Sequence, residues 1–181
     1  MCSVQGYDDI LLYLNGVGES EDLDSWDLID ASIDENETES ENFEAMLNET
    51  MSVAMSAVAP SDTRNKESIQ DNKFVKVRYM YTQGSKRFGS SRSKKGRPFC
   101  RAMEAARKVY RKEDILRMQS DGVNSQLGHN KQSYSLWLHK GGVNCHHKFE
   151  RRIYLKRVKN DGTPYAGGAL TGVKRASIKE A

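Results

Sequence analysis

The sequence predicts an α+β protein in which a small basic domain follows an acidic segment that is partly helical and partly disordered. Two observations predict this class. Acidic and basic residues are divided unevenly between the two halves of the chain, and apolar residues become regularly spaced from about residue 73 onward. Within the basic domain we expect one strand, one or two helices and a β-hairpin.

Charge separates the chain into two halves. Residues 1–70 hold 17 acidic residues and two bases, a net charge of −15, whereas residues 71–181 hold 8 acidic residues and 26 bases, a net charge of +18. Hydrophobic residues are 37% of the 181, and the mean hydropathy of −0.74 is low for one continuous core. A single compact enzyme is therefore not expected. The basic half could contact nucleic acid, an acidic protein surface or the acidic half itself; the alternative is two independently solvated surfaces.

Other features of the composition exclude further classes. No run of about 18 apolar residues is present, so we expect no membrane span. The N-terminus carries Asp8 and Asp9 and no basic region, which argues against a secretory signal. An odd number of cysteines, three, argues against a disulfide framework and favours a reducing compartment.

Four regions follow along the chain. Residues 1–60 form the acidic segment, with one helix expected over Tyr7 to Asn15 and another from Ser40, its N-cap, to Pro60. The second helix has a methionine-rich apolar stripe, which is either core or a partner-binding face. The other regions are a polar linker (61–72), the basic Cys/His domain (73–158) and a flexible, glycine-rich tail (159–181).

The basic domain has a readable element order. Alternation predicts a strand over Lys73 to Thr82, with Val77, Tyr79 and Tyr81 on one face and Lys76 and Arg78 on the other. A basic, glycine- and serine-rich loop precedes a helix that opens at Pro98, where the missing N–H costs nothing. The remaining expected elements are a helix over Lys112 to Met118 and a hairpin that joins Tyr134–Leu138 to His146–Val158.

Cysteine and histidine residues gather in the second half of the chain. Thiolate and imidazole suit zinc, which takes four ligands in a structural site. Because side chains alternate along a strand, Cys145 and His147 share a face and His146 points away. The alternative is a pair of buried thiols with hydrogen-bonded histidines. The candidate metal ligands are Cys100, Cys145, His147 and His146, with His139 as a further candidate.

A cysteine-dependent enzyme is the rival hypothesis. Cys100 lies in the first turn of its helix, where the helix dipole and Arg97 would lower its pKa, and His147 would act as the base. The nearest orienting group is Asn144. No phosphate-binding loop, dinucleotide-binding, zinc-protease or serine-hydrolase motif is present. We therefore expect no catalysis and no small-molecule substrate.

Basic residues are interleaved with aromatic ones along the first strand and the hairpin. Such surfaces bind nucleic acid by stacking and phosphate contact, and the same pattern arises when aromatic residues face the core and bases face water. No zinc-finger spacing or ribonucleoprotein motif is present, so a nucleic-acid-binding regulator ranks below the enzyme. The candidate contacts to nucleic acid or a protein partner are Arg78, Lys86, Arg87, Arg92, Lys94, Lys95, Arg151 and Arg152.

Five motifs occur in order: Val75–Tyr81, Arg97–Met103, Lys108–Ile115, Tyr134–Gly142 and Asn144–His147. Together, over roughly residues 73–158, they resemble the C-terminal region of virion-associated proteins of tailed phages and prophages of Bacteroidetes, including crAss-like phages. A weaker similarity runs to Mu-type minor head (head morphogenesis) proteins, which also pair a Phe-Cys helix start with a later Asn-Cys-x-His hairpin.

The resemblance implies a virion component of the head or portal, made in the cytoplasm of the host bacterium. Its partners would be other virion proteins and packaged DNA. Cys100, Cys145 and His147 carry over as the clustered Cys/His positions. His139 stands where related proteins often have Tyr, which weakens it as a ligand, and Phe149 stands where Trp is expected. Relatives are expected to be longer at the N-terminus.

Overall fold

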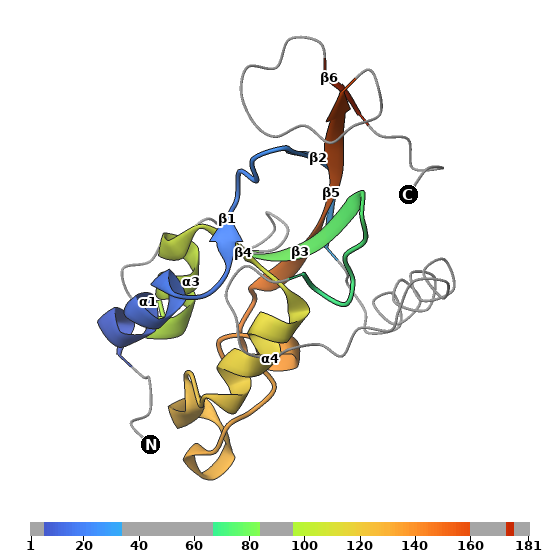
Figure 1. The fold of residues 1–181 in the computed structure, drawn as a ribbon. Coiled ribbons are helices and arrows are strands. Elements are labelled where there is room, and N and C mark those ends of the chain that lie inside the picture. The colour runs from blue at the N-terminus through green and yellow to red at the C-terminus, as the bar shows by residue number, and fades with distance from the viewer. Residues whose placement is uncertain (1–5, 34–66, 84–95, 160–172, 176–181) are drawn as a thin grey trace.

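The computed structural model describes residues 6–33, 67–83, 96–159 and 173–175 (Figure 1). The helix expected from Ser40, the first half of the polar linker, nearly all of the basic loop and nearly all of the tail lie outside these residues. Among the described residues, no helix combines the length and hydropathy needed to span a membrane.

The described residues form an α+β fold built on an antiparallel sheet with the strand order β1-β4-β3-β5-β2, and a short β6 pairs with β5. The helices are α1 (Tyr7–Asn15), α3 (Pro98–Ala106), α4 (Lys112–Ser120) and α5 (Leu136–His139). The strands are β1 (Glu19–Ser20), β2 (Trp26–Ile33), β3 (Val75–Thr82), β4 (Lys108–Tyr110), β5 (Lys148–Lys159) and β6 (Val173–Arg175).

The expected hairpin is wrong. Its first strand is instead the short helix α5, whose N-cap Ser135 accepts a hydrogen bond from the Leu138 N–H through Oγ at 3.2 Å. Short apolar runs fit both helical and strand spacing, and here the serine cap selects the helix. The second expected strand is β5, which pairs with β3, Tyr81 opposite Phe149, and with β2. The expected arrangement of one strand and a hairpin is therefore wrong, and both β3 and β5 belong to a larger antiparallel sheet.

The N-terminal part of the acidic half belongs to this sheet. Strand β2 runs beside β5 from Trp26, opposite Lys156, to Ile33, opposite Glu150, and β1 pairs with β4. Helix α1 packs beside α3 at one end of the sheet (Figure 1). Acidic side chains of this part pair with bases of the other half, as in Asp27–Arg157, where Oδ1 and Nε are 2.8 Å apart. The basic half therefore contacts the N-terminal part of the acidic half within the same chain.

The core lies between the helices and the central strands. Ile10 and Leu14 of α1 and Phe99 of α3 are fully buried, and Met103 is 1% exposed. Phe99 and Met103 are four residues apart on α3, so both side chains lie on the same, core-facing side of the helix. The buried core also contains Val77, Tyr79, Tyr81, Ala102, Tyr110, Ile115, Met118, Val123, Leu136 and Phe149.

Arg78 departs from the predicted pattern. Its side chain is 0% exposed, although alternation assigned it to the solvent face. Nη1 lies 2.7 Å from Oδ1 of Asp71, and Nη2 lies 2.9 Å from Oε1 of Glu19. The two carboxylates come from the turn before β3 and from β1, so the charge is paired inside the fold. Arg78 is therefore not a surface group that could contact nucleic acid or a partner.

Candidate metal site

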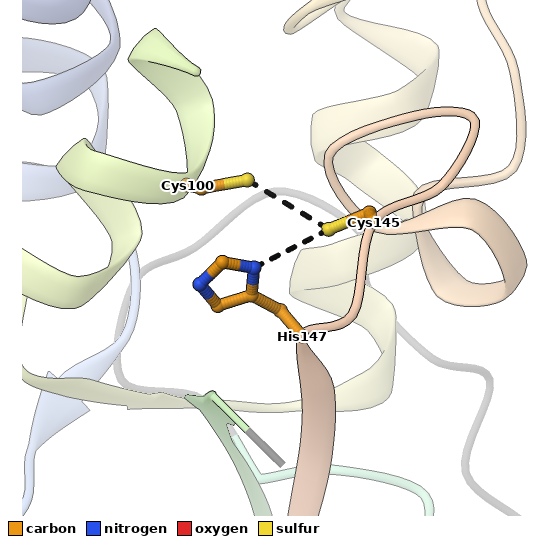
Figure 2. Close-up of side chains that lie close together, drawn as sticks. All are labelled: Cys100, Cys145 and His147. Atoms are coloured by element: carbon orange, nitrogen blue, oxygen red, sulfur yellow. Dashed lines mark hydrogen bonds between the residues drawn. The ribbon is translucent and has the colours of Figure 1, made fainter. Parts of the chain in front are cut away.

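Cys100, Cys145 and His147 come together at one end of β3 and β5. Cys100 is in the first turn of α3, and Cys145 and His147 lie in the segment that leads into β5 (Figure 2). One ligand atom from each residue lies within 4.8 Å of the others, so the three residues can hold a metal ion. Of the four ligands predicted from the sequence, the structure brings together these three. The fourth, His146, is exposed and lies outside the group.

The distances between the donor atoms are short. The sulfurs of Cys100 and Cys145 are 3.8 Å apart, and Sγ of Cys145 lies 3.4 Å from Nδ1 of His147 (Figure 2). The Tyr81 hydroxyl lies 3.3 Å from Sγ of Cys100 and 3.4 Å from Sγ of Cys145. Four polar atoms from three parts of the chain therefore surround one small volume.

A tight turn brings Cys145 to α3. Lys140, Gly142 and Asn144 have φ values of 50°, 102° and 58°, the left-handed region that favours glycine and costs other residues. Between them, a Cβ placed on Gly141 would lie 2.3 Å from Sγ of Cys100. Glycine is thus required where the backbone passes the sulfur. Such a strained turn beside polar side chains is typical of a functional site.

Arg97 holds this turn against the start of α3. Its guanidinium donates from Nη1 to the Gly141 carbonyl oxygen at 2.7 Å and from Nη2 to the carbonyl oxygen of Val143. Because Arg97 precedes Pro98, the contact ties the turn to the helix that carries Cys100. The positive charge of Arg97 also opposes the rise in the pKa of Cys100.

The two sulfurs have unequal proton affinities. The hydrogen bond between them raises the pKa of Cys100 and lowers that of Cys145, and burial raises the pKa of Cys100 further. Cys100 is therefore the weaker acid of the pair and Cys145 the stronger. Burial lowers the pKa of His147, but its hydrogen bonds to Cys145 and Glu104 outweigh burial and raise it.

Glu104 orients the imidazole from behind. Its Oε1 lies 2.9 Å from Nε2 of His147 and also accepts a hydrogen bond of 2.8 Å from Gln83. This fixes Nε2 as the protonated nitrogen and leaves Nδ1 to face the sulfurs. A carboxylate behind a ligating histidine is the usual outer partner of a metal site.

Glu104 and Tyr81 were missed from the sequence. Glu104 follows Cys100 by four residues on one helix, a spacing that places both side chains on the same face. That spacing was a usable signal. Tyr81 was expected only as an inward strand residue, and nothing in the sequence indicates that its hydroxyl meets the cysteines.

The remaining predicted site residues are placed differently. His139 lies in α5, outside the group of three, with its ring 6.3 Å from that of Tyr134. Arg152 pairs with Glu150 and Glu21, each at 2.7 Å, and Arg151 donates to Oγ of Ser32. The bases predicted to contact a partner from the loop, Lys86, Arg87, Arg92, Lys94 and Lys95, lie outside the described residues.

Comparison with known protein families, curated proteins and solved structures finds no match for the chain.

Proposed function

We propose that this chain is a non-catalytic assembly protein of a phage particle, in which Cys100, Cys145 and His147 bind a structural zinc ion. The observation that carries the metal part is the convergence of two sulfurs and Nδ1 of an oriented imidazole. A tetrahedral zinc site with Zn–S bonds of about 2.3 Å and Zn–N bonds of about 2.0–2.1 Å separates two sulfurs by about 3.8 Å and a sulfur from a nitrogen by about 3.6 Å. The sulfurs are 3.8 Å apart, and the Cys145 sulfur is 3.4 Å from Nδ1.

A metal at this position would act as a staple. It would join the first turn of α3 to the segment that begins β5, two parts of the chain separated by α4 and α5. A small domain with limited apolar mass gains most from such a cross-link. Because metal binds the folded site and not the dispersed ligands, its binding free energy becomes folding free energy.

The virion assignment rests on the motifs of residues 73–158, and the location in the head or portal follows from the same resemblance. Its partners would be other virion proteins and packaged DNA. Since Arg78 and Arg152 are engaged in ion pairs within the fold, a DNA contact would depend on the bases of residues 86–95.

Elemental mass spectrometry of the purified chain tests the metal part. We expect about one zinc per chain, lost in Cys145→Ser. The matched control is Cys2→Ser, which removes a cysteine outside the predicted ligand set and should keep the metal. A wild-type chain without metal after purification and zinc reconstitution would refute the staple.

The virion part is tested independently. Mass spectrometry of particles purified from the host that encodes the chain should detect it in amounts that persist through density-gradient purification. If DNA is a partner, its affinity should fall steeply with salt, because phosphate contacts release counterions. A chain absent from particles contradicts the assignment, and salt-insensitive binding contradicts the DNA contact.

One observation favours a second candidate, a thiol-dependent enzyme. Cys145, His147 and Glu104 form a nucleophile–base–carboxylate series, with 3.4 Å between Sγ and Nδ1 and 2.9 Å between Nε2 and Oε1. The nucleophile would be Cys145 and not Cys100, which was the sequence-based candidate. Alkylation at neutral pH separates the two proposals: a free thiolate reacts at once, and a metal-bound one reacts only after chelation.

A further inference from the structure

The Tyr81 hydroxyl lies beside both sulfurs of the candidate metal site, which otherwise offers three ligand atoms. It lies 3.3 Å from Sγ of Cys100 and 3.4 Å from Sγ of Cys145. In a tetrahedral zinc site an oxygen ligand at about 2.0–2.2 Å is separated from each sulfur by about 3.6 Å. The two observed distances are close to this value, as the sulfur–sulfur and sulfur–nitrogen distances are to theirs.

The tyrosine cannot turn away from this position without disturbing the core. Its side chain is 3% exposed, and its ring meets Phe99 and Phe149 edge to face at centroid distances of 5.7 Å and 5.4 Å. The opposite contact is a stack on the imidazole of His147 at 4.9 Å, with 13° between the ring planes. The ring packing therefore aims the hydroxyl at the two sulfurs.

Without a cation, the hydroxyl is poorly matched to its surroundings. The Tyr81 hydroxyl bonds to sulfur, a weak acceptor. A buried tyrosine hydroxyl usually finds an oxygen or nitrogen partner. In the described part of the chain, the hydrogen bonds of this hydroxyl are those to the two cysteines.

We propose that Tyr81 is the fourth ligand of the site, so that zinc is held by two sulfurs, Nδ1 of His147 and the phenolate oxygen. The inference rests on the proposed zinc site and adds to it. Coordination by the phenolate oxygen would release the phenol proton of Tyr81 to solvent. With all four positions filled by the chain, no position remains for a water or substrate, as in closed structural zinc sites. Coordination by Tyr81 would therefore make this a closed structural zinc site and not a hydrolytic one.

Zinc titration of the metal-free full-length chain tests this proposal. We expect the near-ultraviolet tyrosinate band to grow to saturation at one equivalent of zinc and to be absent in Tyr81→Phe. The variant should bind zinc at least about tenfold more weakly and release one proton fewer per zinc in weakly buffered solution. Cobalt in place of zinc should keep its sulfur charge-transfer band in the variant, because both cysteines remain, while its visible bands change.

The matched control is Tyr134→Phe. The Tyr134 hydroxyl accepts from Nδ2 of Asn124 at 2.6 Å and donates to the Lys140 carbonyl oxygen at 2.9 Å, so it should contribute no tyrosinate band. If wild type binds zinc without the band and Tyr81→Phe binds it equally tightly, the fourth ligand is refuted and the staple stands. If wild type binds no zinc, both proposals fail. Should Tyr81→Phe not fold, the wild-type band alone decides.

Discussion

Two buried polar clusters lie close together along β3, one around Arg78 and one around Tyr81, and they differ in the charged groups that they contain. Around Arg78, a guanidinium is enclosed by the carboxylates of Asp71 and Glu19, so the chain provides both signs of charge. Around Tyr81, two sulfurs, an imidazole and a hydroxyl converge, and the nearby Arg97 guanidinium bonds to the carbonyl oxygens of Gly141 and Val143. Because residues 78 and 81 differ by an odd number, the clusters lie on opposite faces of the sheet.

The two clusters differ in whether folding alone pairs their charged and polar groups. The Arg78 cluster is electrostatically satisfied once β1 and the turn at Asp71 pack against β3. The second cluster gathers residues that can hold a metal ion, and Glu104 already bonds to the imidazole. Stability should therefore depend on metal at one cluster and not at the other.

The largest effect is expected at the first cluster. Arg78→Met keeps much of the side-chain volume and leaves Asp71 and Glu19 without their cation. Breaking a buried ion pair in this way costs about 3–5 kcal/mol. Urea unfolding should show the loss both with zinc and with a chelator. Arg157→Met is the control, since its partly exposed pair with Asp27 should contribute at most about 1 kcal/mol. A loss at Arg78 no greater than this control would mean that the buried cluster is not a distinct source of stability.

Gly141→Ala should act at the second cluster. The new Cβ would lie 2.3 Å from Sγ of Cys100 and 3.2 Å from Sγ of Cys145, so the turn or the first turn of α3 must move. Overpacking of this kind costs about 1–3 kcal/mol, and the displaced sulfurs should no longer bind zinc in a titration. Gly122→Ala, which has strained φ but meets only Ser125 at 3.9 Å or more, should lose stability and keep zinc. Equal zinc affinity in both variants would show that the close approach at Gly141 does not shape the site.

The same comparison explains what could be predicted from the sequence. The helix at Pro98 and the strand at residues 73–82 follow from local spacing, which the structure keeps. Cys145 and His147 come together as predicted, although both precede β5 and neither lies on a regular strand. Arg78 could not be placed, because its burial depends on carboxylates supplied from two other segments. A base within an alternating strand is otherwise expected to face water.

Strand β2 shows a second limit. No strand was predicted within the acidic segment, and the register shift between Leu28 and Asp30 interrupts the alternation that would have indicated one. Its partner β5 is rich in bases, and Asp27 pairs with Arg157 across the two strands. Charge complementarity between distant segments therefore completes a strand that local hydrophobicity does not predict. The expected hairpin failed for a related reason, since β5 had a better partner in β3 than in the residues of α5.

The smallest effect is expected from Glu104→Gln, which tests whether the carboxylate strengthens His147 as a metal ligand or only orients its ring. The glutamine can still accept the hydrogen bond from Nε2 of His147 but no longer supplies the negative charge that makes the imidazole a stronger ligand. Loss of such an outer partner typically weakens metal binding by about 10–100-fold. Competition with a chromophoric chelator would measure it. Glu113→Gln is the matched control, because Glu113 accepts hydrogen bonds from Ser68 and Ile69 far from the metal ligands and should leave zinc affinity unchanged. If Glu104→Gln binds zinc as tightly as the control, the carboxylate only positions the ring. The fold would then set the geometry of the site without raising the basicity of the His147 imidazole.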